Sequence, residues 1–115
     1  MLTKRVTLVL ILLLISVFLV ACERKKIADI NADPGSFVNK EVAVAGQVTQ
    51  SIGALGMGIY QINDGTGSLW VLSESRGVPT KGAHVGVKGR ITPTLTFLGV
   101  NYATVMRETD RRSGS

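Results

Sequence analysis

Residues 57–73 read MGIYQINDGTGSLWVLS and contain two β-rich runs, 59–62 and 69–72, separated by a turn signal. Between the runs, Asp64-Gly65 suits the positive φ angles of a tight reversal, so the pattern predicts an antiparallel hairpin. Side chains alternate along a strand, which predicts one face made of Tyr60, Ile62, Leu69 and Val71, and another made of Ile59, Gln61, Ser68, Trp70 and Leu72. Both faces are partly apolar. One should therefore meet a core, and the other a ligand, a second layer or nothing else.

Alternating runs on either side of the hairpin predict further strands. Residues 41–52 alternate Val with smaller or polar side chains, and Gly46 in their middle would allow a bend or bulge. The Gly-rich residues 51–56 are expected to form a flexible connection into the hairpin. Residues 84–92 also alternate, with one apolar face and a second face formed by His84, Gly86, Lys88 and Arg90.

A proline separates this run from the last predicted strand. Pro93 is expected to break the pairing, and residues 95–106 then supply a strand with Gly99 as a candidate bulge. Residues 108–115 are polar and charged, and they are expected to fray as a tail.

The N-terminal residues have the layout of an export signal. Lys4-Arg5 precedes the uncharged run 6–20, which is shorter than the ~20 residues that a membrane-spanning helix usually needs. A permanent N-terminal membrane anchor is the alternative interpretation, and the length of the run argues against it.

Leu19-Val20-Ala21-Cys22 resembles the lipobox of bacterial lipoproteins. The resemblance implies cleavage of a signal peptide at residues 1–21, a diacylglycerol thioether on Cys22, and acylation of its amine by a fatty acid such as palmitate. Cys22 is the only cysteine of the chain, so a monomer can have no disulfide and no Cys-based metal site. The expected location is extracytoplasmic and membrane-anchored. Because Glu23 replaces the Asp that favours inner-membrane retention, the outer membrane facing the periplasm is expected in a Gram-negative source.

The charge of the chain carries little information about its partner. The net charge of +5 at pH 7 includes Lys4 and Arg5, which would leave with the signal peptide, so bulk charge does not indicate nucleic acid. Residues 23–26 are expected to be a solvated spacer beside the membrane, with a lipid-headgroup site as the alternative. Residues 22–37 would form the tether, with one helical turn or a tight loop near Pro34-Gly35.

Five short strands, glycine bends and the absence of a long helix after the signal peptide predict an all-β fold, a small antiparallel barrel at residues 38–107. The chain resembles the OB-fold domains of the anticodon-binding and single-strand-binding type. The resemblance lies in residues 42–48, 60–71, 82 and 85–91, and it covers most of residues 38–106. It implies a five-stranded Greek-key barrel.

The resemblance also implies a binding surface on the outer face of the second and third strands and on the adjoining loops. Carried over to this chain, the rims are residues 51–56 and 92–94, and the face is Ile59, Gln61, Ser68 and Trp70. Trp70 would stack a nucleobase or a sugar ring, and Lys88 and Arg90 would meet a polyanion. The chain departs from single-strand binders in its low aromatic content of 5%.

Each of these residues also has a purely structural interpretation. Trp70 would instead pack under the N-terminal segment near Phe37. Lys88 and Arg90 would form an ordinary solvated strand face. Asp64 would fix the hairpin through its own backbone rather than coordinate a metal, because no cluster of His, Asp or Glu accompanies it.

The sequence does not indicate an enzyme, a cofactor or a metal site. His84 is the sole histidine, and neither a nucleophilic arrangement nor a pair of carboxylates at useful spacing accompanies it. The membrane-tethered haem chaperones of cytochrome maturation are exported OB-folds that use a histidine, but the residues around His84 lack their motif.

Two functional hypotheses follow. The first is a non-enzymatic binding module, anchored to the membrane by its lipid, that holds single-stranded nucleic acid or a cell-envelope glycan on the face containing Trp70. The second is an envelope scaffold whose barrel docks another protein. The sequence leaves the ligand, the membrane leaflet, the oligomeric state and the pathway open.

Overall fold

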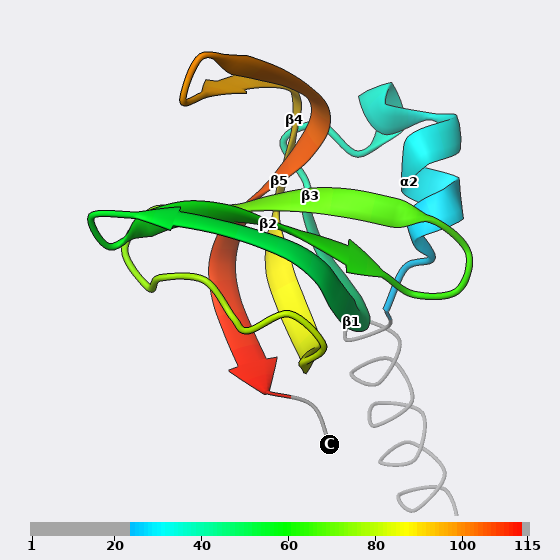
Figure 1. The fold of residues 1–115 in the computed structure, drawn as a ribbon. Coiled ribbons are helices and arrows are strands. Elements are labelled where there is room, and N and C mark those ends of the chain that lie inside the picture. The colour runs from blue at the N-terminus through cyan, green and yellow to red at the C-terminus, as the bar shows by residue number, and fades with distance from the viewer. Residues whose placement is uncertain (1–23, 114–115) are drawn as a thin grey trace, which may run out of the picture.

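A computed structural model describes residues 24–113 of the chain (Figure 1). The predicted signal peptide, 1–21, and the predicted lipidation site, Cys22, lie outside the described residues. A short helix, α2 (Ile27–Ala32), and a 3-10 turn, Pro34–Ser36, precede five strands: β1 (Glu41–Ala54), β2 (Met57–Asn63), β3 (Ser68–Ser73), β4 (His84–Phe97) and β5 (Val100–Ser113). No helix within residues 24–113 is long and apolar enough to cross a membrane.

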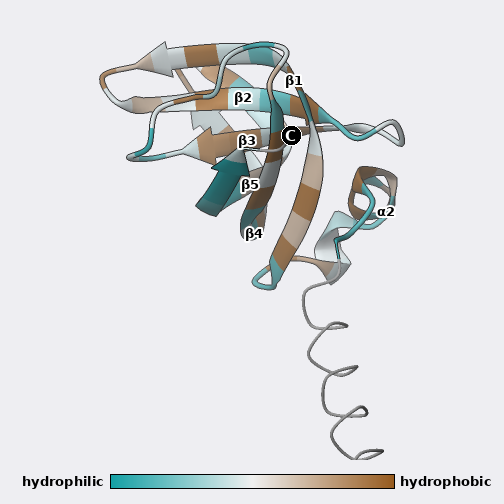
Figure 2. Cartoon of the chain, turned by 90° about the horizontal axis from the view of Figure 1, so that it is seen from below, coloured by the Kyte–Doolittle hydropathy of each residue, from teal (hydrophilic) through white to brown (hydrophobic). Residues whose placement is uncertain are grey.

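The strands close into a barrel in the order β1-β2-β3-β5-β4, with β4 pairing back onto β1. Strands β3 and β5 are parallel, and the other neighbouring strands are antiparallel. The predicted fold class, an all-β five-stranded barrel, is confirmed. Figure 2 shows hydrophobic and hydrophilic bands alternating along the strands, as a barrel with one buried face requires.

The inner face of the barrel holds the main core. The alternation predicted for the central hairpin is correct, because Tyr60, Ile62, Leu69 and Val71 are all buried in this core. Valines and an isoleucine of the flanking strands meet them there: Val42, Val44, Val48, Val85, Val87 and Ile91. The irregularity in β1 falls between Val48 and Gln50 rather than at Gly46, although a β-carbon on Gly46 would lie only 2.5 Å from the Asn63 carbonyl oxygen at the end of β2.

Helix α2 closes one end of the barrel. Ile27 and Ile30 are fully buried in the main core, and Phe37 packs against it. The sequence suggested only a tether with one turn for this segment. The structure differs because isoleucines three residues apart fall on one side of a helix, which presents both to the open barrel end.

The β4–β5 hairpin is longer than the sequence suggested. Pairing continues past Pro93, from Thr92 with Val105 to Phe97 with Val100, so residues 92–94 are part of a strand and not a loop at the rim. Strand β4 pairs with β1 only up to Arg90, so Pro93 stands on a portion bonded on one side, where a proline is tolerated. The chain reverses at Leu98-Gly99 with φ angles of 50° and 79°, so Gly99 is a turn residue and not a bulge.

Two other segments expected to be irregular are also paired. Strands β1 and β2 remain in register to Ala54 and Met57, and a two-residue turn at Leu55-Gly56 with φ angles of 55° and 78° joins them. The predicted flexible loop is therefore a tight hairpin end. The expected frayed tail pairs with β4 up to Ser113.

Candidate functional site

The outer face of β2 and β3 is the surface on which the sequence analysis placed a ligand. Gln61 and Trp70 are direct neighbours across these two strands, and Ser68 pairs with Asn63 at the end of the ladder. Gln61, Ser68 and Trp70 are all half-buried. The structure thus brings these three predicted residues onto one surface.

Ile59 does not face a ligand, and its prediction as a contact residue needs correction. Its side chain is 0% exposed and belongs to a second apolar cluster with Leu72, Phe97 and Val105. The long β4–β5 hairpin supplies Phe97 and Val105, which cover this part of the β2–β3 face. The chain's own hairpin therefore forms the second layer at Ile59.

Trp70 sits at the edge of this second cluster. Its ring centroid lies 4.9 Å from that of Tyr102 at an interplanar angle of 64°, an edge-to-face contact. Phe37 belongs to the main core instead, so Trp70 does not pack under the N-terminal segment. Trp70 is therefore half-buried, and its contact with Tyr102 restricts how the indole can rotate.

Uncharged amide and hydroxyl groups lie beside Trp70. The Thr49 hydroxyl donates to the Gln61 side-chain oxygen at 3.1 Å, and the Gln50 amide donates to the same oxygen at 3.4 Å. These contacts orient the Gln61 side chain next to the indole. The arrangement offers an aromatic edge and neutral hydrogen-bonding groups, which together suit a neutral polar ligand better than a polyanion.

Lys88 and Arg90 lie elsewhere on the barrel. Both are on β4, which is separated from β3 by β5 in the strand order. Lys88 is exposed, and the Arg90 guanidinium donates to the carbonyl oxygen of Asn39 at 2.9 Å. The structure does not bring these cations together with Trp70.

Exposed apolar residues gather at the ends of two hairpins, which the sequence analysis did not single out. Leu55 in the β1–β2 turn is 106% exposed, and Leu98 in the β4–β5 turn is 68% exposed. Their apolar neighbours in the two hairpins are also exposed: Ile52, Met57 and Val100. In Figure 1 both hairpin ends project to the left, away from α2. A large aliphatic residue inside a Gly-containing turn was the available sequence signal.

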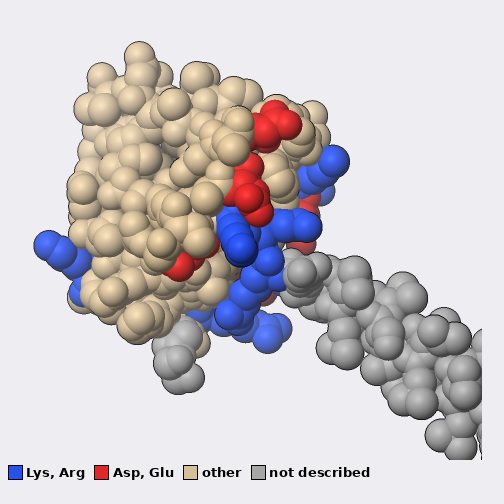
Figure 3. All heavy atoms as spheres, turned by 90° about the vertical axis from the view of Figure 1, so that its right-hand side faces the viewer, with Lys and Arg blue, Asp and Glu red and all other residues tan. Residues whose placement is uncertain are grey.

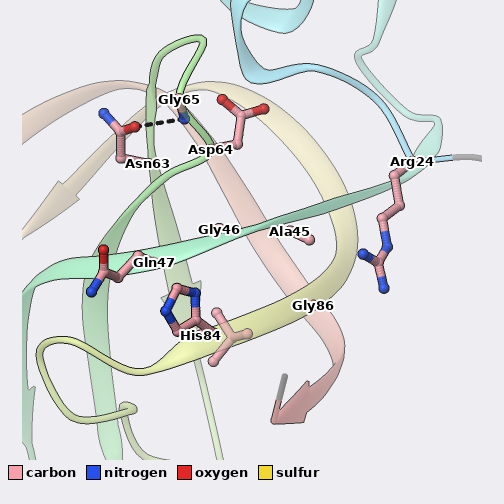
Figure 4. A pocket seen from close by; sticks show the side chains of 10 residues that line it. Arg24, Ala45, Gly46, Gln47, Asn63, Asp64, Gly65, His84 and Gly86 are labelled. Atoms are coloured by element: carbon pink, nitrogen blue, oxygen red, sulfur yellow. Dashed lines mark hydrogen bonds between the residues drawn. The ribbon is translucent and has the colours of Figure 1, made fainter. Parts of the chain in front are cut away.

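A hollow of about 520 Å³ lies at the other side of the barrel, between β1, β4 and the β2–β3 turn. Figure 4 shows Arg24 across this hollow from Gln47 and His84, while the Asp64 carboxylate points away from His84. The Asp64 carboxylate is already hydrogen-bonded to the backbone, since it accepts from the N–H of Ile27 at 2.9 Å. The Asp64 carboxylate here serves the fold, and it forms no acid–base pair with His84.

The hydrogen bonds to Asp64 have an electrostatic consequence. Burial raises the pKa of its carboxyl, but donors from Ile27, Thr66 and Gly67 outweigh this effect and hold the pKa below its usual value. Three of those bonds close the hairpin turn, from the Thr66 N–H, the Thr66 hydroxyl and the Gly67 N–H. The prediction that Asp64 fixes the hairpin through the backbone is correct, and its bond to Ile27 was not anticipated.

A buried polar network lies under the loop between β3 and β4. The Tyr60 hydroxyl donates to Glu108, whose side chain is 1% exposed and pairs with Arg111 at 3.0 Å. Arg111 also donates to the Gly77 carbonyl and lies over the Tyr60 ring. Burial, assisted by Glu108, raises the pKa of Tyr60 far above its ordinary value. The sequence analysis placed Glu108 and Arg111 in a frayed tail, so it missed this network.

The described part of the chain contains no group of three or more His, Cys, Asp or Glu side chains placed to hold a metal ion. Among the same residues, His84 is exposed on β4, and the other charged side chains that line its pocket are Arg24 and the Asp64 already bonded to the backbone.

Comparison with solved structures identifies the barrel type. A protein described as an aspartyl-tRNA synthetase from Leishmania major Friedlin superimposes with a TM-score of 0.60 and 13% identity over 79% of this chain. The barrel is an OB-fold. The chain spans about a fifth of that synthetase, 21% of its length. A second match is OBody AM3L09 bound to hen egg-white lysozyme, with a TM-score of 0.54, 18% identity, and coverage of 68% of this chain and 84% of the OBody. No protein-family profile and no curated protein sequence matches the chain.

Proposed function

We propose that this protein is a non-enzymatic OB-fold binding module, held at a membrane by a lipid on Cys22, that binds a neutral cell-envelope glycan on the β2–β3 face. The choice of ligand rests on how Trp70 and Gln61 are arranged. Trp70 is oriented by Tyr102 and stands directly across the ladder from Gln61, whose amide is held by Thr49 and Gln50.

The charge distribution supports a glycan over a nucleic acid. Single-strand binders combine stacking aromatics with a basic groove that follows the phosphates. Here Lys88 and Arg90 lie on β4, two positions around the barrel from β3. A sugar ring needs an aromatic surface and neutral hydrogen-bonding groups, which Trp70 and Gln61 supply. OB-folds use this same face for oligosaccharides and for oligonucleotides.

A fluorescence titration tests the proposal, because Trp70 is the only tryptophan of the chain. Uncharged oligosaccharide fragments of the cell envelope are expected to give a saturable change in emission that salt barely affects. Trp70→Ala should weaken binding about tenfold, since an aromatic contact is worth on the order of 1–2 kcal/mol. Trp70→Ala and Trp70→Phe both lack tryptophan, so their binding is measured by calorimetry. Trp70→Phe should retain most of the affinity.

Lys88→Gln is the matched control for this experiment, because the residue is exposed and remote from β3. Single-stranded oligonucleotides provide the competing ligand. Binding of an oligonucleotide that is lost at high salt and in Lys88→Gln, with no response to glycans, would contradict the proposal and assign the module to nucleic acid.

The exposed ends of the β1–β2 and β4–β5 hairpins favour a second candidate, an envelope scaffold that docks another protein. Exposed apolar patches on a soluble surface commonly mark interaction sites. Leu55 and Leu98 are the most exposed large apolar side chains of the described chain. They would enter apolar pockets of a partner, as anchor residues do.

Serine substitutions at Leu55 and Leu98 separate the two candidates. A scaffold should lose a reproducibly co-purifying envelope protein in the double variant and keep it in Trp70→Ala. Glycan binding should show the reverse pattern. Pull-downs of the detergent-solubilised protein that repeatedly return the bait alone would count against the scaffold.

The membrane anchor is a separate part of the proposal, supported by the resemblance of residues 19–22 to a lipobox. Mass spectrometry of the expressed full chain should give a peptide that begins at Cys22 and carries a diacylglyceryl group and a fatty acyl chain. Fractionation of a Gram-negative host should place the protein in the outer membrane. An N-terminus at Met1, or an unmodified thiol at Cys22, would refute lipidation.

A further inference from the structure

The first described residues, from Arg24 onward, are attached to the wall of the barrel. The backbone N–H of Lys25 donates to the Ala43 carbonyl oxygen of β1 at 2.8 Å. Immediately afterwards Ile27 and Ile30 are buried in the main core, and the Ile27 N–H is bonded to Asp64. The barrel therefore cannot swing freely about residues 24–26, so these residues are not only a flexible spacer.

This attachment places the basic residues of the segment against basic residues of the strands. The Arg24 guanidinium lies 3.9 Å from where a β-carbon on Gly86 would stand. Lys88 follows on the same side of β4, and Arg112 is the ladder partner of Gly86 on β5. We call the exposed side chains of Arg24, Lys25, Lys88 and Arg112 the basic face.

The basic face has few acidic neighbours. Asp110 on β5 is the ladder partner of Lys88 but pairs with Arg76 at 3.2 Å, and Glu41 lies at the start of β1. Asp64 lines the same hollow as Arg24, but it is bonded to the backbone of Ile27. Figure 3 shows Lys and Arg side chains gathered in the lower part of the view, with Asp and Glu side chains mainly above them. On the face that Figure 3 shows, basic and acidic side chains are therefore partly segregated.

The distance from this face to the anchor is short. Only Glu23 lies between Cys22 and Arg24, and two steps along an extended chain span at most about 7 Å. A lipid on Cys22 would hold Arg24 at headgroup level, where each Lys or Arg strengthens attachment to an anionic surface about fivefold. We propose that the basic face rests on the anionic lipid surface, so that the hairpin ends bearing Leu55 and Leu98 point away from the membrane. This orientation rests on the lipid anchor of the proposed function.

Site-specific labelling of the lipidated full chain in vesicles tests the orientation. Lipidation consumes the only native thiol, so a cysteine introduced on the surface is the only one that a fluorophore can modify. His84→Cys places the label on the basic-face side of β4, and Leu98→Cys places it at the hairpin end. A lipid with a spin-labelled headgroup, which quenches nearby fluorophores, is included in vesicles of phosphatidylcholine and phosphatidylglycerol.

The label at His84→Cys is expected to be quenched severalfold more strongly than the label at Leu98→Cys. Adding Lys88→Gln and Arg112→Gln to the His84→Cys chain should remove the difference, as should vesicles of phosphatidylcholine alone. The matched control is Lys88→Arg with Arg112→Lys, which preserves both charges and should preserve the quenching. Far-UV circular dichroism checks that every variant keeps its strands.

The possible failures are distinguishable. Absence of the lipid mass on Cys22 overturns the anchor and, with it, this orientation. A lipidated chain whose two labels are quenched equally overturns the orientation alone. Quenching at His84→Cys that ignores both charge variants and lipid charge overturns the role of the basic face. Release of that quenching by single-stranded DNA, at concentrations where anionic vesicles remain in excess, would assign the face to nucleic acid instead.

Discussion

At the scale of single residues, Asp64 joins two parts of the chain that the sequence keeps far apart. One carboxylate oxygen closes the β2–β3 turn through Thr66 and Gly67, and the other accepts from the Ile27 N–H at the start of α2. The residue thereby stabilises the hairpin and the barrel closure together. Its substitution should affect both.

Asp64→Ala is expected to lower the free energy of unfolding by about 1–2 kcal/mol, because it leaves backbone donors without their acceptor. The pKa of the Asp64 carboxyl is lower in the folded chain than in the unfolded one. Its contribution is therefore complete above the unfolded pKa of about 3.9 and is lost as the pH falls through the folded pKa. Urea denaturation across that range should show a shallower acid dependence in Asp64→Asn. Identical slopes for variant and parent would refute this role.

Glu108 is the second residue whose loss should be severe. Glu108→Ala leaves Arg111 without its carboxylate and Tyr60 without its hydrogen-bond acceptor, at a site where Glu108 is 1% exposed. Breaking a buried ion pair typically costs about 3–5 kcal/mol. Thermal unfolding monitored by circular dichroism is the measurement. Glu108→Gln, which can still accept from Tyr60, should lose less, and equal stability of Glu108→Ala and the parent would contradict the network.

At the scale of elements, the long β4–β5 hairpin decides what the β2–β3 face can do. It covers Ile59 and Leu72 with Phe97, and it holds Trp70 in place with Tyr102. Within the same hairpin, Gly89 of β4 pairs with Glu108 of β5 beside a register irregularity. A β-carbon on Gly89 would lie 2.2 Å from the Arg107 carbonyl oxygen, so the close approach of the two strands requires glycine.

Gly89→Ala is therefore expected to cost about 1–3 kcal/mol of unfolding free energy, because the backbone of β5 must move to admit the methyl group. Gly86→Ala is the matched control on the same strand, since the nearest atom there is a flexible Arg24 side chain at 3.9 Å. Chemical denaturation of both variants measures the two losses of unfolding free energy. Comparable losses in the two would mean that the crowding at Gly89 is relieved elsewhere.

At the scale of the whole molecule, α2 and the barrel form one packed unit. Ile30 is 0% exposed and belongs to the same core as Tyr60 and Val87. Truncation of a buried isoleucine to alanine costs about 2–5 kcal/mol. Ile30→Ala should therefore lower the melting temperature of the entire barrel in a single transition. A barrel that melts as before, with only local changes at the N-terminus, would show that α2 is an independent tether.

The sequence predicted more of the barrel than of its surface. The alternation of apolar residues correctly assigned the inner faces of the strands, including that of the central hairpin, because burial imposes a period of two on any half-buried strand. It failed where polar residues are paired, as in residues 108–113, and where a proline stands on a strand bonded on one side. Neither position carries a hydrophobic period, so neither could be recognised.

The candidate site was likewise predicted from the sequence only in part. The residue types on the β2–β3 face followed from the strand pattern, and Gln61 and Trp70 do lie together there. Which residues stay accessible depended on a hairpin from much further along the chain, as the contact of Trp70 with Tyr102 on β5, 32 residues later, illustrates. The local pattern thus established the all-β barrel, its inner face and the lipobox resemblance. Only the tertiary structure decided that the β4–β5 hairpin covers Ile59, that Lys88 is remote from Trp70, and that Arg24 lies against β4. Each of these facts depends on which distant segments of the chain meet.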